Sequence, residues 1–63
     1  MKKIQDVKVG VMDGDTRMVW ECKSCDYLFR TGYCFPMGVD DVGEFIPCQK
    51  CMCSAHLVRT ERI

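Results

Sequence analysis

The sequence predicts a small, mostly β domain that is stabilised by a bound metal ion, and three observations support this. The chain has 63 residues, and a hydrophobic core of that size alone contributes no more than about 3–5 kcal/mol. Six of those residues are cysteines. Apolar and polar residues alternate in several stretches, whereas no stretch combines helical periodicity with capping residues. Sulfur ligands therefore have to supply stability that the core lacks.

The first half of the chain predicts three strands. Residues 4–11 place alternate valines on one face, which is typical of a half-buried strand. The turn signal Asp13-Gly14 then predicts a hairpin that pairs this strand with a second one at 16–21. The aromatic-rich stretch 27–35 predicts a third strand with a bend at Gly32.

The second half predicts a long loop and one closing strand. Residues 35–47 contain prolines, glycines, three acidic residues and no basic residue, which predicts a loop. Residues 56–62 alternate again and predict the last strand.

Two cysteine pairs carry the chemistry of the sequence, Cys22-Lys23-Ser24-Cys25 and Cys48-Gln49-Lys50-Cys51, with 22 residues between them. Two residues between cysteines suit a tight turn that aims both sulfurs the same way. Two such pairs together supply the four sulfurs of a tetrahedral zinc site. A pair of disulfides is disfavoured because the N-terminal stretch 1–10 lacks the apolar core of a secretion signal, which predicts a cytoplasmic protein.

At these residues the sequence resembles the zinc-ribbon and rubredoxin-like group of small domains, in which two cysteine knuckles hold one metal. The stretch 22–29 is similar to the first knuckle of rubredoxins, with an aromatic residue at Tyr27. The resemblance covers roughly residues 20–53 and implies a single zinc-ribbon-like domain over residues 1–63. It also implies Zn²⁺ as the cofactor, with iron in the same cage of a rubredoxin-like electron carrier as the alternative. The implied metal ligands are Cys22, Cys25, Cys48 and Cys51.

The sequence departs from the family pattern in both knuckles. Members usually place glycine directly after the second cysteine, where the backbone tends to need a left-handed conformation. Here those positions hold Asp26 and Met52, of which aspartate tolerates that conformation better. Proline also stands before Cys48, at Pro47, whereas rubredoxins usually place it after the corresponding cysteine.

Three further residues are possible ligands: Cys34, Cys53 and His56. Cys53 or His56 could replace one of the four cysteines, because both follow Cys51 closely. Alternatively, Cys34 and Cys53 are small buried residues, and His56 lies on the surface of the last strand. Both interpretations stay open at this level.

The function that follows from this sequence is binding rather than catalysis. A zinc ion with four thiolates has no open coordination position, so we expect no enzyme activity. A catalytic thiol helped by Lys50 or His56 is the weaker alternative, because so small a chain has little room for a substrate pocket. We expect an accessory or regulatory adaptor that binds a larger protein or a nucleoprotein complex.

The partner class follows from charge and from the excess of large apolar residues. Nine basic and nine acidic residues give a net charge of zero, and no apolar run is long enough to span a membrane. Five methionines and six aromatic residues either fill an irregular core or form an exposed contact surface or homodimer interface. A nucleic-acid-binding ribbon is the third alternative, although we expect that binding to be weak. Its candidate face consists of Lys23, Arg30, Lys50, Arg59 and Arg62 beside Trp20, Tyr27, Phe29 and Tyr33.

Overall fold

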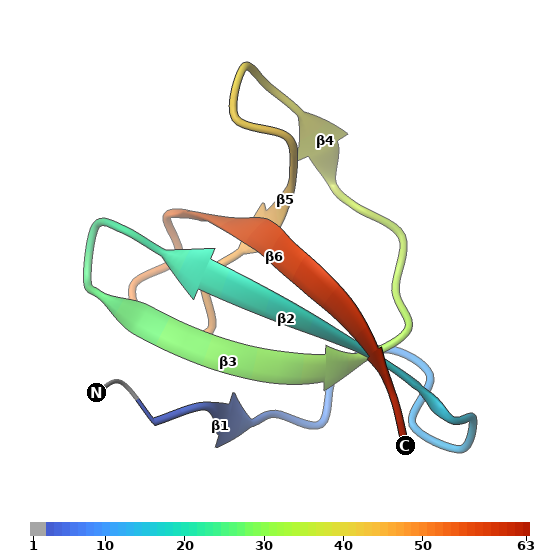
Figure 1. Cartoon of the computed structure of the whole chain (residues 1–63). Coiled ribbons are helices and arrows are strands. Elements are labelled where there is room, and N and C mark those ends of the chain that lie inside the picture. The colour runs from blue at the N-terminus through green and yellow to red at the C-terminus, as the bar shows by residue number, and fades with distance from the viewer. Residues whose placement is uncertain (1–2) are drawn as a thin grey trace.

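The computed structural model describes residues 3–63, which form one six-stranded sheet (Figure 1). The order across the sheet is β1-β3-β2-β6-β5-β4. Within the described residues, no helix has the length and apolarity needed to cross a membrane. Met1 and Lys2, which begin the stretch inspected for a secretion signal, lie outside the described residues. The strands are β1 (Gln5–Asp6), β2 (Thr16–Cys22), β3 (Tyr27–Gly32), β4 (Gly38–Val39), β5 (Glu44–Pro47) and β6 (Ser54–Arg62).

The three long strands β2, β3 and β6 form the centre of the sheet, and the strands predicted at 16–21 and 56–62 are confirmed. Strand β2 pairs antiparallel with β3 on one side and with β6 on the other. Its residues Val19 and Trp20 are fully buried, as is Phe29 of β3. The indole N–H of Trp20 donates to Thr31 Oγ1 at 2.9 Å, so this buried polar group is satisfied. The core therefore lies on the middle strands, next to the two cysteine turns.

The predicted first strand and its hairpin are wrong. Strand β1 contains only two residues, and it pairs parallel with β3 instead of antiparallel with β2. Gly10 lies after β1, and its φ of 79° interrupts the extended path expected over residues 4–11. A Cβ there would lie 2.5 Å from the carbonyl oxygen of Tyr33. After this turn only Val11 returns to the sheet, in an isolated bridge to Tyr33.

The predicted loop at 35–47 is also wrong, because it contains the hairpin of β4 and β5. Asp40 makes the turn: its Oδ1 accepts the backbone N–H groups of Val42 (2.9 Å) and Gly43 (3.2 Å). Its own N–H donates to the carbonyl of Gly43 at 3.1 Å. Strand β5 then pairs with β6 and joins the hairpin to the sheet. The acidic residues that predicted a loop therefore include Asp40, whose side chain stabilises a tight turn.

Candidate metal centre

The two cysteine turns lie at neighbouring strand ends. Cys22 ends β2, and Cys25 stands just before β3 begins at Tyr27. Cys48 follows β5, and the second turn leads into β6. Because β6 pairs with both β2 and β5, the sheet order brings the two turns to the same edge of the molecule. The long central strands thus position all four cysteines.

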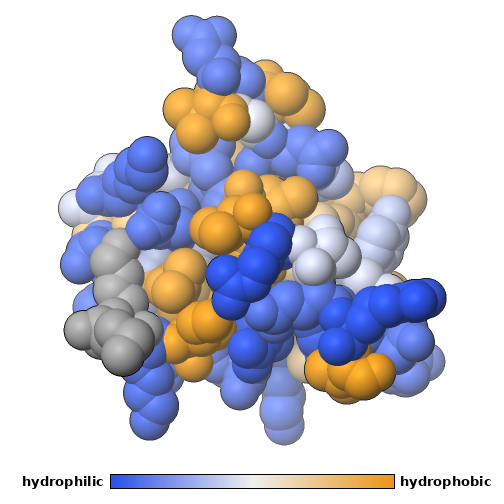
Figure 2. Space-filling model, viewed as in Figure 1, coloured by the Kyte–Doolittle hydropathy of each residue, from blue (hydrophilic) through white to orange (hydrophobic). Residues whose placement is uncertain are grey.

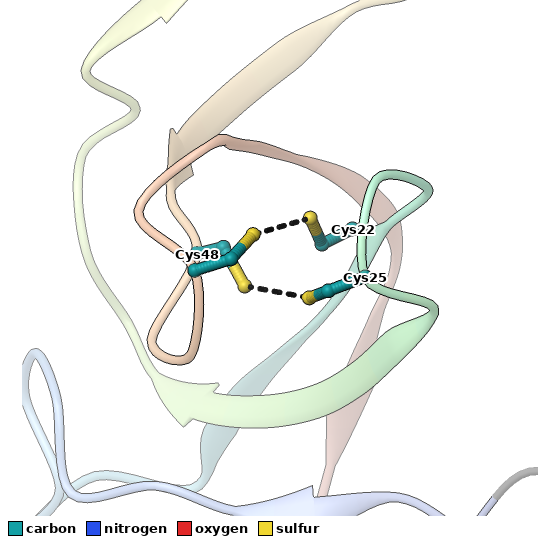
Figure 3. A group of neighbouring side chains, drawn as sticks. Cys22, Cys25 and Cys48 are labelled. Atoms are coloured by element: carbon teal, nitrogen blue, oxygen red, sulfur yellow. Dashed lines mark hydrogen bonds between the residues drawn. The ribbon is translucent and has the colours of Figure 1, made fainter.

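The four sulfur atoms form a compact group with tetrahedral dimensions. The Sγ atoms of Cys22 and Cys51 lie 3.5 Å apart, as do those of Cys25 and Cys48. All four Sγ atoms lie within 4.8 Å of one another. A tetrahedron with metal–sulfur bonds of about 2.3 Å has edges of about 3.8 Å, which falls inside this range. Figure 3 shows the thiols of the first turn facing those of the second. The group can hold one metal ion.

Both turns use the same backbone conformation after their second cysteine. The φ angle is 59° at Asp26 and 68° at Met52, and these are the non-glycine residues with positive φ in residues 3–63. The left-handed conformation expected at these two positions is therefore confirmed, although neither residue is glycine. Methionine at such a position carries a steric cost of about 1–2 kcal/mol.

Backbone hydrogen bonds hold the second turn closed around Cys48. The N–H of Lys50 donates to Cys48 Sγ at 3.3 Å. The N–H of Met52 donates to the carbonyl of Cys48 at 3.1 Å, and the N–H of Cys48 donates to the carbonyl of Cys53 at 2.6 Å. The Lys50 bond points a donor toward the Cys48 sulfur, which favours its thiolate form, and the other two bonds close the backbone of the turn.

The close packing of the four thiols shifts the pKa values of two of them in opposite directions. Burial, together with hydrogen bonds to the neighbouring thiols, raises the pKa of Cys25 to about 12. Burial also raises the pKa of Cys48, but the backbone N–H groups of Cys51 and Lys50 and the nearby thiols outweigh it and lower this pKa to about 7. Four thiolates this close repel one another, so a fully deprotonated group needs a cation at its centre.

Burial places the group at the border of the core. Cys22 and Cys48 are fully buried and belong to the core cluster with Trp20 and Phe29. Cys25 is half-buried, and Cys51 is exposed. A metal ion here would contact the hydrophobic core through Cys22 and Cys48 and would lie near solvent on the side of Cys51.

The three further candidates do not join this group. Cys34 is half-buried, and its backbone N–H lies 3.5 Å from Met18 Sδ. Cys53 is exposed, so its interpretation as a small buried residue is wrong. His56 is half-buried, and its Nε2 lies 2.8 Å from Asp40 Oδ2. In the described part of the chain, the potential ligands that come together are those of the two predicted pairs.

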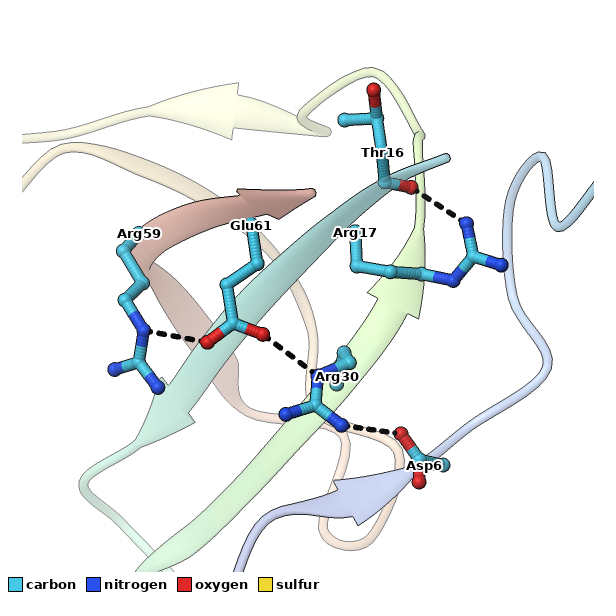
Figure 4. Close-up of polar contacts among 6 residues, drawn as sticks. All are labelled: Asp6, Thr16, Arg17, Arg30, Arg59 and Glu61. Atoms are coloured by element: carbon cyan, nitrogen blue, oxygen red, sulfur yellow. Dashed lines mark hydrogen bonds and ion pairs between the residues drawn. The ribbon is translucent and has the colours of Figure 1, made fainter. Parts of the chain in front are cut away.

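Several residues of the candidate nucleic-acid face are buried or ion-paired in the fold and are not available to bind nucleic acid. Trp20 and Phe29 are fully buried and cannot stack on bases. Arg30 forms ion pairs with Asp6 (2.9 Å) and Glu61 (3.0 Å), as Figure 4 shows. Arg59 pairs with the same Glu61 at 2.9 Å, and this bond, followed by those of Arg30, lowers the pKa of that carboxyl. Two of the five basic residues thus have acidic partners within the chain.

Two residues of that face, Tyr27 and Lys50, line an open cleft of about 520 Å³ beside the cysteine turns. It is lined by Lys3, Tyr27, Gln49 and Lys50, among others. The ammonium of Lys50 lies 5.7 Å from the centre of the Tyr27 ring, which is a cation–π contact between the two turns. Asp26 also lines the cleft, so the cleft carries both basic and acidic side chains.

An exposed apolar surface lies on and next to the β4–β5 hairpin, outside the two cysteine turns, and the sequence did not locate it. We call it the hairpin patch, and its members are 66–82% exposed: Phe35, Met37, Val39 and Val42. The surplus of methionines and aromatic residues predicted either such a surface or an irregular core. The alternation of Phe35, Met37 and Val39 was the available signal for its position, but the prolines and glycines around it favoured a loop.

No known protein family matches this chain, and no match to a curated protein or a solved structure was found. Fold and site together define a small, mostly β protein with a four-cysteine group that can hold a metal ion.

Proposed function

We propose that this protein is a zinc-ribbon-like adaptor in which Cys22, Cys25, Cys48 and Cys51 bind one structural Zn²⁺ and the surface binds a larger protein or nucleoprotein complex. The observation that carries the proposal is the group of four sulfurs within 4.8 Å of one another, two of them fully buried. Four thiols and no other ligand type are a typical donor set for structural zinc.

The metal would complete the fold. Structural zinc contributes on the order of 10–16 kcal/mol to small domains at neutral pH. The core of a chain this size contributes roughly 3–5 kcal/mol. Because Cys22 and Cys48 belong to the core cluster itself, losing the metal would leave charged or unpaired sulfurs inside it. Zinc binding and folding would then be one event.

The adaptor role follows from the chemistry of a closed four-thiolate zinc site. Zinc held by four thiolates has no open position and no redox chemistry, so it organises the surface around it and gives the protein no catalytic role. The exposed apolar residues of the hairpin patch support a protein contact, because large exposed apolar surfaces commonly mark interaction sites.

Elemental analysis of protein purified from medium that contains both zinc and iron tests the metal. We expect about one zinc per chain and a colourless sample. A coloured protein that contains iron and gives a reversible one-electron wave in voltammetry would refute the zinc assignment. It would support the rubredoxin-like electron carrier as the second candidate, in which the same four cysteines would hold iron.

A further inference from the structure

The β4–β5 hairpin has two chemically different faces. In the antiparallel register, Gly38 lies opposite Phe45, and Val39 lies opposite Glu44. The Phe45 ring covers Gly38, where an added Cβ would lie 2.8 Å from it. The same ring packs against His56 of β6, with 5.8 Å between ring centres. This face anchors the hairpin to the sheet, and the face with Val39 and Glu44 is left outward.

The turn of the hairpin is also fixed to the sheet, through Asp40. Asp40 accepts the turn N–H groups of Val42 and Gly43, and its carboxylate contacts His56 Nε2 at 2.8–2.9 Å. The outward face is thus held by a hydrogen-bonded turn and an aromatic contact, so its apolar side chains are exposed on a fixed backbone. A rigid surface loses less entropy when it binds.

The outward face is apolar with an acidic border. Figure 2 shows hydrophobic atoms beside hydrophilic ones over this hairpin, at the top of the view. Glu44 stands next to Val39 across the ladder, and Asp41 lies in the turn, where both are exposed. Residues 35–47 contain no basic residue. A second copy of this chain would place these acids against themselves in a symmetric interface, which disfavours self-association.

The hairpin also ends the sheet. Strand β4 is the last in the sheet order, and it pairs only with β5 among the described strands (Figure 1). Strand β4 has only two residues, which limits main-chain pairing to a short stretch, but its open edge can accept an extended segment through main-chain hydrogen bonds while alternate side chains of that segment meet the exposed face.

We infer that the hairpin patch binds an extended segment of a protein partner that alternates apolar and basic residues and that pairs with the edge of β4. Apolar side chains of the segment pack on Phe35, Met37 and Val39, and its basic side chains meet Glu44 and Asp41. This inference names the partner chemistry of the proposed adaptor and rests on that proposal.

Titration of the isotope-labelled, zinc-loaded chain with a capped peptide of about eight residues that alternates valine and lysine tests this by NMR. We expect the amide signals of Gly38, Val39 and Val42 to shift. Val39→Ser should weaken binding about tenfold, because it removes most of one apolar contact. Val58→Ser is the matched control on β6, outside the patch, and should leave the affinity unchanged. A peptide that alternates valine and glutamate should not bind.

Four results would overturn the inference. Equal binding of the glutamate peptide would remove the role of charge, and shifts confined to the cleft beside Tyr27 would place the site elsewhere. Self-association of the chain in sedimentation, lost in Val39→Ser, would assign the patch to a second copy. Zinc content is measured on the same samples, so a chain with one zinc and no peptide binding refutes this inference alone. A metal-free folded chain refutes only the structural role of zinc.

Discussion

Replacing Met52 by glycine should tighten zinc binding, because Met52 holds a φ of 68° that glycine adopts without steric cost. The left-handed conformation costs an ordinary residue about 1–2 kcal/mol. Met52 is 75% exposed, so its side chain contributes little burial that glycine would lose. The substitution changes the backbone cost of the second turn and almost nothing else.

The expected gain is the steric relief minus the larger entropy of glycine in the unfolded chain. That entropy costs about 0.5–1 kcal/mol relative to alanine. The difference leaves roughly 0.5–1 kcal/mol in favour of Met52→Gly. Since folding and zinc binding are proposed to be one event, this corresponds to a zinc affinity about two- to fivefold higher.

Competition with a coloured zinc chelator at neutral pH measures this difference. Met52→Ala is the matched control: it removes the side chain but keeps the Cβ, so we expect no gain. Asp26→Gly should gain less than Met52→Gly, because aspartate tolerates φ of 59° better than methionine tolerates 68°. An equal gain for Met52→Ala, or no gain for Met52→Gly, would refute the backbone argument.

Four further predictions follow from the core, the thiols and the charges. Serine at any of the four clustered cysteines should abolish both zinc binding and dispersed amide signals in NMR, whereas Cys34→Ser and Cys53→Ser should retain both; loss of zinc in Cys53→Ser would mean that the ligand assignment is wrong. Thr31→Val should lower the free energy of unfolding of the zinc-loaded protein by about 1–3 kcal/mol, because it leaves the buried indole N–H of Trp20 without its acceptor; denaturant unfolding measures this, with the exposed Thr60→Val as control. Zinc affinity should fall by at least about tenfold per pH unit as the pH decreases from 8 to 6, because the Cys25 thiol, with its pKa raised to about 12, keeps a proton that zinc must displace; a chelator competition series with a flat profile would contradict this. Binding to single-stranded or duplex nucleic acid, measured by fluorescence anisotropy, should be lost near physiological salt of about 150 mM, because two of the five basic residues of the candidate face already have acidic partners. Submicromolar binding at that salt concentration would support the nucleic-acid alternative instead.

The local features of the fold were predictable from the sequence, and its pairing was not. The strands at 16–21 and 56–62 were predicted because alternation of apolar and polar residues is a property of neighbouring positions. The partner of the first strand was assigned wrongly because the Asp13-Gly14 turn signal suggests a hairpin, whereas β1 pairs with β3 and Gly10, with its positive φ, interrupts the segment before that turn. A glycine in sequence does not reveal which sign its φ will take.

The candidate site was the most predictable part of the protein. Four cysteines in two pairs indicate a shared metal by spacing, and the resemblance to zinc-ribbon and rubredoxin-like domains implied a left-handed residue after each pair. The sequence by itself thus determined the mostly β character, the two cysteine turns and the residues available as ligands. Only the tertiary structure decided that Cys53 and His56 lie outside the group, that Trp20 and Phe29 are buried, and that residues 35–47 form a hairpin with an outward apolar face. These outcomes depend on contacts between residues far apart in the chain, such as His56 with Asp40, and local patterns carry no information about such contacts.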